Sequence, residues 1–255
     1  MKLSASIVTD PAMIIILLLI AVGAAVQTLS GFAMGLIIMG GVTALGLAEI
    51  GETAAVVSLI SLLNTALALR STYKHLDWHY VRNVSFALVP ALIVGVALLN
   101  WLSGNYYEYL KALLGIFIVG AGTLLMLRPV LYEQPTGHWK VRLAGTIAGL
   151  MGGMYSAGGA PLAYLMYRQP LDVRVVRASL LAMFAVSTAG RAVVTAIDGQ
   201  LDQKILTLAA ISVPVVIVVT VSCNRISHRV PDQLIRKMVF ILLIILGGFL
   251  VSSVM

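Results

Sequence analysis

The chain contains ten apolar runs bounded by polar residues, and most of the longer ones are about 20 residues long. A helix of about 20 apolar residues crosses the hydrocarbon core of a bilayer, whereas the strands of an outer-membrane barrel read as segments of about ten residues with alternating polarity. With 60% hydrophobic residues, 11% charged residues and a mean hydropathy of +1.01, the chain has too little polar surface to cover a soluble globule. The sequence therefore predicts an all-α polytopic membrane protein. The runs cover 11–30, 35–48, 52–70, 81–102, 109–127, 144–155, 161–167, 178–197, 205–223 and 238–255.

Two apolar regions are broken at equivalent places in the two halves of the chain. The breaks lie in "GAAVQTLSGFAMGLIIMGG" (23–41) and "GLMGGMYSAGGAPLAYLMY" (149–167), and aligning these stretches places Ser30 on Ser156. Weak internal symmetry of this kind is typical of transporters with a duplicated helical unit. We predict two repeats, each a re-entrant, glycine-broken helical hairpin plus three transmembrane helices. The N-terminal repeat, 1–130, would contain a hairpin at 11–48 and spans at 52–70, 81–102 and 109–127; the C-terminal repeat, 140–255, would contain a hairpin at 144–167 and spans at 178–197, 205–223 and 238–255.

The basic residues indicate how the broken regions sit in the membrane. If each broken region crossed once, the lysines and arginines other than Arg191, which lies inside a helix, would divide eight against eight between the two sides. If each one enters and leaves on the same side, one side holds thirteen of them and the other holds only Lys2, Lys111 and Lys204. The positive-inside rule then makes the thirteen-residue side cytoplasmic. A single helix over 11–48 would also be about 57 Å long, well beyond a hydrocarbon core of about 30 Å.

This topology predicts that the two halves are inverted in the membrane. The first hairpin would enter from outside and the second from the cytoplasm, and both chain termini would be non-cytoplasmic. The two hairpin tips would then approach each other near the bilayer midplane.

The hairpin tips are the candidate binding site, and the expected ligand is an anion. Irregular backbone at membrane depth is tolerated where it is buried in protein or lines a wet cavity. The helix that restarts after each break directs free N–H groups and its positive dipole end at the tip, glycines allow close approach, and Pro161 suits a first helical turn. The predicted substrate-binding residues here are Ser30, Gly31, Phe32, Ala33, Met34, Gly35, Tyr155, Ser156, Ala157, Gly158, Gly159, Ala160 and Pro161. For Gly149, Gly152 and Gly153, close helix packing is the favoured interpretation.

Three polar residues inside the spans complete the candidate site. Arg191 lies about 21 Å along its helix from Arg177, where it would attract an anion or, alternatively, snorkel to the outer interface near Asp198. Gln27 and Asn64 would donate to a ligand or join helices through a hydrogen bond.

The remaining polar residues are expected to have structural roles. Glu52 and Arg177 begin the helices that follow the hairpins, and we predict that they anchor and cap those helices; proton coupling by Glu52 is the alternative. His75 and His79 have a spacing that suits a metal, but they lie in a basic loop with aromatic neighbours, which is typical of a membrane interface. We predict no metal and no other cofactor, and the chain lacks the glycine-rich lysine motif of an ATP site.

The second break and the residues after it resemble a known transporter family. "MGGMYSAGGAPLAYLMY" followed by "RVVRASLLAMFAVS" is similar to the TauE/SafE family of sulfite and organosulfonate exporters, also called TSUP, and "ETAAVVSLISLLN" resembles the helix that follows the first hairpin in that family. The first half departs from the family pattern, because "SGFAMGLII" stands where a glycine triplet and a proline are common, so Phe32 and Met34 are expected to shape one wall of the pocket. The resemblance covers essentially the whole chain. It implies a bacterial or archaeal inner-membrane carrier that moves sulfite, thiosulfate, sulfoacetate or related sulfonates, commonly outward.

We therefore predict a secondary transporter, not an enzyme, that moves a small sulfur-containing anion by alternating access around a midplane site. A passive anion channel and an intramembrane enzyme acting on lipid are the alternatives, and the enzyme would require buried His, Asp or Glu residues. The basic residues sit in short loops rather than in a lysine-rich arm, which excludes nucleic acid as a partner. The expected partners are the anion and membrane lipid, while the coupling ion, such as a proton, and the oligomeric state stay open.

Overall fold

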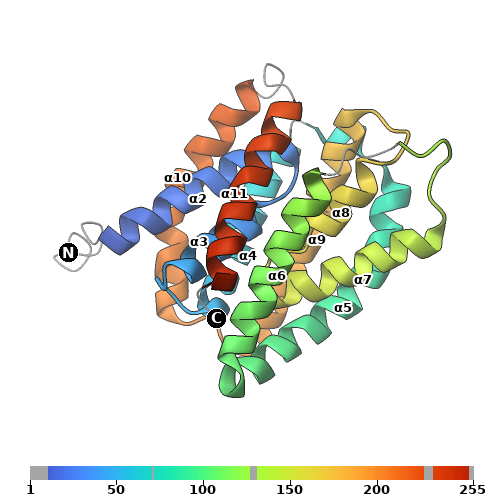
Figure 1. Cartoon of the computed structure of the whole chain (residues 1–255). Coiled ribbons are helices and arrows are strands. Elements are labelled where there is room, and N and C mark those ends of the chain that lie inside the picture. Colours follow the sequence, from blue (N-terminus) through green and yellow to red (C-terminus); the bar gives the residue numbers. More distant parts are fainter. Residues whose placement is uncertain (1–10, 71, 127–130, 227–231, 253–255) are drawn as a thin grey trace.

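Helices joined by short connections make up the described part of the chain. The computed structural model describes residues 11–70, 72–126, 131–226 and 232–252, and no strand occurs among them. Lys2, Arg128 and Arg229, which the charge prediction counts, lie outside the described residues, as do both outer ends of the predicted repeats. The helices are α2 (Pro11–Ser30), α3 (Met34–Ala44), α4 (Ile50–Leu69), the 3-10 turn η1 (Tyr73–His75), α5 (Trp78–Asn105), α6 (Tyr107–Met126), α7 (His138–Tyr155), α8 (Gly159–Met166), α9 (Val173–Ile197), α10 (Gln203–Ile226) and α11 (Asp232–Ser252), arranged as in Figure 1.

The all-α membrane fold is confirmed. Within the described ranges, α2, α4, α5, α6, α9 and α10 are long and apolar enough to span a bilayer. Both predicted breaks are present, because α2 ends at Ser30 and α3 begins at Met34, while α7 ends at Tyr155 and α8 begins at Gly159. Three long helices follow each broken pair, so the two halves share one order of elements. The inverted relation of the halves and the side of the membrane on which each loop lies stay predictions.

The first broken region folds back on itself as a hairpin. A Cβ added to Gly41 would lie against the Leu19 side chain, and one added to Gly23 would lie 3.2 Å from the side chain of Ile38. Leu19 thus faces Gly41, and Gly23 faces Ile38. Residue numbers therefore rise along α2 as they fall along α3, which means that the two helices run antiparallel. The turn at the break therefore reverses the chain, as the excessive length of 11–48 predicted.

Helix α7 packs along α5 through a ladder of glycines. Added Cβ atoms at Gly145, Gly149 and Gly153 would each overlap a backbone carbonyl of α5, those of Val84, Leu88 and Leu92 in turn. Both series advance by four residues, so α5 and α7 run parallel with their backbones in close contact. The packing interpretation of Gly149 and Gly153 is confirmed, and Gly152 instead faces Ser187 of α9.

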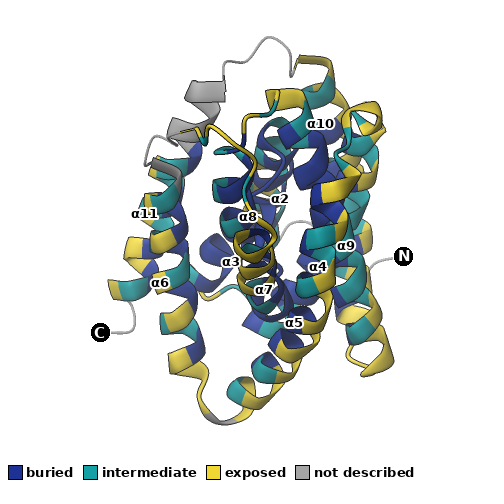
Figure 2. Ribbon diagram, turned by 90° about the vertical axis from the view of Figure 1, so that its right-hand side faces the viewer, coloured by how far each residue is buried: buried dark blue, intermediate teal, exposed yellow. Residues whose placement is uncertain are grey.

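The short helix α3 lies at the centre of the bundle. Every residue from Met34 to Thr43 is buried, and Figure 2 shows this helix in dark blue, enclosed by the longer helices. A helix that is apolar on all sides requires such an environment. The first turn of α3, and with it the first break, therefore lies deep inside the protein.

The predicted starts of several spans were wrong by a few residues. Helix α5 begins at Trp78 rather than 81, because the Asp77 carboxylate accepts hydrogen bonds from the backbone N–H groups of His79 and Tyr80. Asp172 caps α9 at Val173 in the same way, five residues before the predicted 178. Helix α7 begins at His138 rather than 144. Apolarity alone misses such starts, since a capped first turn is polar and still helical.

Candidate functional site

The two breaks meet inside the bundle. A Cβ added to Gly35, in the first turn of α3, would overlap the carbonyl oxygen of Ser156 and lie 3.1 Å from the Cα of Ala157. A Cβ added to Gly159, which begins α8, would overlap the Phe184 ring and lie 3.1 Å from the Cβ of Phe32. The hairpin tips therefore touch, and glycine is required where each helix restarts.

The first tip satisfies its polar groups largely within itself. Gly31 and Ala33 have φ angles of 86° and 83°, and the residue between them, Phe32, is buried. The Ser30 hydroxyl lies 2.8 Å from the Val26 carbonyl and 3.0 Å from the Phe32 carbonyl, so its proton is used locally. The Ser30 carbonyl accepts a hydrogen bond of 3.0 Å from the Tyr167 hydroxyl at the end of α8. This tip is a closed turn held by the second half of the chain.

Arg177 also holds the first tip. Its guanidinium donates to the carbonyl of Thr28, one turn before the break, and lies 3.5 Å from the Asn224 amide oxygen on α10. The prediction that Arg177 is an interfacial anchor and cap was wrong, because the side chain turns inward to the Thr28 carbonyl. That carbonyl lies in the last turn of α2, where the helix ends and the usual intrahelical donor is missing. Glycine at position 31 supports this arrangement, since an added Cβ would lie 3.2 Å from the Arg177 carbonyl.

The second tip reaches across the protein. Ser156 ends α7 with a φ of 51°, and its hydroxyl donates a hydrogen bond of 2.7 Å to the carbonyl of Ala54 in the first turns of α4. The Nε of Arg191, on α9, donates to the same carbonyl at 3.3 Å. Ser156 and Arg191 are thus brought together by a shared backbone acceptor, although they lie on different helices.

Arg191 is a buried charge that has no counterion among the residues the structure describes. Its side chain is 2% exposed, and its Nη1 is buried with no hydrogen-bond partner among the described residues. Within the described ranges, Lys204 and Glu52 form an ion pair, and no carboxylate pairs with Arg191. The predicted alternative of snorkelling toward Asp198 was wrong, because the guanidinium turns to α4 inside the bundle. A buried cation of this kind demands an anion or further acceptors.

Gln27 and Asn64 form a polar cluster that joins three helices. The Gln27 amide donates to the Asn64 amide oxygen at 2.9 Å, and the Asn64 amide donates to the hydroxyls of Thr28 at 2.9 Å and Thr220 at 2.7 Å. All four side chains are fully buried, and they link α2 and α4 to α10. The Gln27 Oε1 has no partner among the described residues. The helix-joining interpretation of these two residues is confirmed.

The starts of α3 and α8 add backbone donors beside the second tip. The first N–H groups of a helix have no intrahelical acceptor, and neither Ala33 nor Gly158, the two N-cap residues, supplies a side-chain acceptor. Both helix starts therefore present N–H groups and a positive dipole end where the tips meet. Pro161 is the third residue of α8 and lies in its first turn, as predicted.

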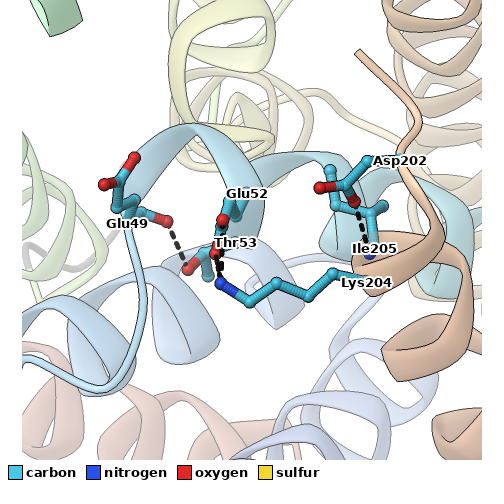
Figure 3. Close-up of polar contacts among 6 residues, drawn as sticks. All are labelled: Glu49, Glu52, Thr53, Asp202, Lys204 and Ile205. Carbon is cyan, nitrogen blue, oxygen red and sulfur yellow. Dashed lines mark hydrogen bonds and ion pairs between the residues drawn. The ribbon is translucent and has the colours of Figure 1, made fainter.

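An ion pair joins the first turns of α4 and α10. Lys204, in the first turn of α10, places its Nζ 2.7 Å from Oε2 of Glu52 and 2.9 Å from Oε1, in the first turn of α4 (Figure 3). The Glu52 side chain is 28% exposed and that of Lys204 69% exposed, so the pair lies at the edge of the protein. Glu52 therefore bridges the two halves rather than only anchoring α4. The charge prediction places this end outside the cytoplasm.

Comparison with known proteins decides the family. The family model described as "Sulfite exporter TauE/SafE" matches residues 15–250. The chain belongs to the TauE/SafE family. It is 36% identical over 232 residues to a protein of Cupriavidus necator named "Probable sulfite/organosulfonate exporter TauE", and the match covers 91% of each chain. No solved structure shows a significant match. Membership makes the chain a membrane exporter rather than an enzyme, as the resemblance predicted.

Some predicted site residues of this TauE/SafE protein lie away from the Ala54 carbonyl that Ser156 and Arg191 share. The Tyr155 hydroxyl donates to the Leu110 carbonyl on α6 at 2.9 Å. Ala160 and Pro161 line a groove that α8 shares with α6 and α7. Met34 packs against α2 at Gly23, and Gly158 packs against the Ala148 carbonyl of α7. Phe32 meets the Tyr167 ring edge to face, with ring centroids 6.5 Å apart, so it borders the first tip.

Three groups of the site were missed from the sequence. The Ala54 carbonyl is a backbone acceptor in an apolar helix, and nothing in its sequence context signals it. Thr28 and Thr220 complete the Asn64 cluster, and Tyr167 binds the first tip. Tyr167 carried a usable signal, since it is the last residue of the broken stretch 149–167.

The histidines do not gather into a metal site. Within the described ranges, no group of three His, Cys, Asp or Glu side chains could hold a metal ion. The His79 ring instead lies 5.4 Å from the ring of His138 at the start of α7.

Proposed function

We propose that this chain exports small sulfur-containing anions, with sulfite, thiosulfate and organosulfonates such as sulfoacetate as the substrate class. The name of the Cupriavidus necator relative supports sulfite and organosulfonates, and the match to it extends over 91% of both chains. We place the ligand at the second hairpin tip, where Ser156, Arg191 and the starts of α3 and α8 supply donors.

One observation carries this placement: the buried Arg191 guanidinium shares the Ala54 carbonyl with the Ser156 hydroxyl, and its Nη1 has no hydrogen-bond partner among the described residues. A sulfite or sulfonate group carries three oxygens on one sulfur, so it can accept together from the guanidinium, from a helix N–H group and from the Ser156 hydroxyl once that hydroxyl turns away from the Ala54 carbonyl. Hydrogen bonds between charged partners are about twice as strong as neutral ones. The anion would also neutralise the charge of Arg191, which lowers the cost of burying both groups.

The proposed transport cycle is alternating access of the two halves. The direct contact of the tips and the burial of Arg191 support a closed intermediate, in which the site opens to neither side. Opening at the end of the bundle where α4 and α10 begin would require those helices to separate. Lys204 and Glu52 would then form a gate that breaks in each cycle.

Counterflow in proteoliposomes tests the function. Liposomes are loaded in turn with sulfite, thiosulfate, sulfoacetate, taurine, sulfate, phosphate or chloride, and entry of a labelled sulfur anion is followed. We expect sulfite, thiosulfate or sulfoacetate inside to accelerate entry, and phosphate and chloride to leave it unchanged. If folded protein gives no acceleration with any internal anion, or passes currents that scale with voltage without exchange, the carrier mechanism is wrong and a channel replaces it.

Substitution of Arg191 tests the site. Arg191→Gln should lower counterflow by about 10- to 100-fold, the value of one to two charge-assisted hydrogen bonds. Because the substitution removes an unpaired buried charge, thermal stability should be unchanged or higher. Arg142→Gln, a basic residue of α7 that lies over the Phe86 ring, is the matched control and should transport normally. Arg191→Gln with normal transport, or with lost folding, would remove Arg191 from the binding site.

The proposed gate has its own test. Lys204→Glu and Glu52→Lys should each place like charges at the contact, favour the open end and change the counterflow rate by several-fold. The double variant restores an ion pair of opposite polarity and should return the rate toward that of the unmodified protein. Rates in the double variant that are the product of the two single effects would show that the pair is not a gate.

A further inference from the structure

A groove of about 490 Å³ lies between α6, α7 and α8, outside the proposed transport site. Its walls are apolar over most of their length, formed by residues such as Ile116 and Leu124 of α6 and Leu143 and Ile147 of α7. Ile116, Leu143 and Ile147 are at least 41% exposed, so this face of the bundle meets the surrounding medium. In a membrane protein that medium is the lipid chains.

One end of the groove is cationic. Lys140 and Tyr132 line it, with the Lys140 Nζ 5.5 Å from the centre of the Tyr132 ring, and the Arg168 guanidinium lies 4.5 Å from the same ring. The Arg168 guanidinium also lies 5.1 Å from the ring of Tyr164, another lining residue. Glu133 adjoins Tyr132 in sequence, but no ion pair joins it to Lys140 in the described structure.

The groove therefore has a polar-to-apolar axis. Leu124, Lys140 and Tyr164 lie at its cationic end, while Ile116 and Ile147 lie toward the other end. From Leu124 to Ile116 the axis of α6 covers about 12 Å, which is a substantial part of one bilayer leaflet. The charge prediction places the loops around 128–142 and 168–177 on the cytoplasmic side, where anionic lipids attract basic residues near the surface.

We propose that this groove binds an anionic phospholipid, with its phosphate at Lys140 and Arg168 and an acyl chain along α6 and α7. The charge and the order of the lining residues both favour this occupant over a soluble anion, which would leave the apolar length unfilled. The chain end would contact Ala160 and Pro161 in the first turn of α8. Bound lipid would thus brace the helix that restarts after the second break.

Two pairs of variants separate this site from general effects. Lys140→Gln removes the cation at the groove, while Arg142→Gln removes a cation two residues away that lies over Phe86 of α5. Gly120→Leu places a side chain in the groove, and an added Cβ there meets nothing within 4 Å, so the variant should fold. Gly248→Leu is its control, because Gly248 is a similarly open glycine of α11 that does not line the groove.

The experiment is native mass spectrometry of the purified full chain titrated with phosphatidylglycerol or phosphatidylcholine of identical acyl chains. We expect phosphatidylglycerol to bind at least about fivefold more tightly, the contribution of one basic residue near an anionic lipid. Lys140→Gln should remove about fivefold of that preference, Gly120→Leu should lower binding of both lipids at least tenfold, and both controls should behave like the unmodified chain. Binding is read directly, so the result does not depend on which anion is transported.

Three results would overturn the proposal. Equal affinity for the two lipids would remove the headgroup site, and equal losses in Lys140→Gln and Arg142→Gln would indicate diffuse attraction to a basic surface. Displacement of the lipid by millimolar inorganic phosphate, with binding unaffected by Gly120→Leu, would assign the cationic end to a soluble anion instead.

Discussion

The first break closes on itself, whereas the second break reaches across to α4 and α9. Ser30 and Ser156 align in the sequence repeat, yet the Ser30 hydroxyl contacts carbonyls within its own turn and the Ser156 hydroxyl contacts Ala54 beside Arg191. The carbonyls near the first tip also receive Arg177 and Tyr167, so that tip is held from outside as well. The second tip shares an acceptor instead with Arg191, which has no counterion in the described part of the chain.

This difference shows that two residues can occupy equivalent positions in the repeat and still have different roles in the site. Equivalent residues bring both breaks to the same place, but only the Ser156 hydroxyl shares its backbone acceptor with a buried arginine. We infer that the first tip acts as a fixed support and that the second tip contributes most of the ligand contacts. The following predictions test that division, beginning with the largest effect.

The glycines at the tip contact should be unequal in cost. Gly35→Ala would drive a Cβ into the Ser156 backbone carbonyl, which cannot rotate away, whereas Gly159→Ala meets mainly the Phe184 ring, which can shift. Gly35→Ala should destabilise the protein by about 1–3 kcal/mol or more and abolish counterflow, with a smaller loss for Gly159→Ala. Thermal unfolding in detergent and counterflow measure both. The reverse ranking would show that the tips do not touch in the working protein.

The two serines should separate transport from stability. Ser156→Ala removes a donor from the proposed site and should lower counterflow by about tenfold, because a hydrogen bond to a charged ligand contributes about 1.5 kcal/mol or more. Ser30→Ala should cost about 1 kcal/mol of folding free energy, with the transport rate of the folded fraction retained. Both residues become alanine, so the comparison is matched. Equal losses of transport in Ser156→Ala and Ser30→Ala would show that both tips contribute to ligand binding, which contradicts the proposed division.

Backbone strain at the first tip gives the smallest effect. Ala33 has a φ of 83°, a conformation that costs a residue with a Cβ about 1–2 kcal/mol. Ala33→Gly relieves this cost but also raises the conformational entropy of the unfolded chain, which partly offsets the gain. We therefore expect a net stabilisation of about 1 kcal/mol or less and unchanged counterflow. If Ala33→Gly slows transport instead, the strained turn is part of the moving machinery and the first tip is not a fixed support.

The amount of the site that could be predicted varied with the kind of interaction. Glycine, serine and proline in an apolar run located both breaks, because a membrane helix has no other reason to carry them together. The roles of Arg177 and Arg191 could not be assigned, since each depends on a backbone carbonyl, of Thr28 or Ala54, contributed by a distant helix. Both residues begin as costly charges near apolar sequence, and only packing decides which backbone carbonyl each guanidinium contacts.

The sequence by itself determined that this chain forms membrane helices, where they break and to which family it belongs. These properties follow from local hydrophobicity and from residue order, which do not require distant contacts. The tertiary structure alone decided that Gly35 meets Ser156, that Asn64 is joined to Gln27 and Thr220, and that Arg191 has no counterion among the described residues. Such contacts join residues far apart in the chain, and their chemistry exists only after the helices have packed.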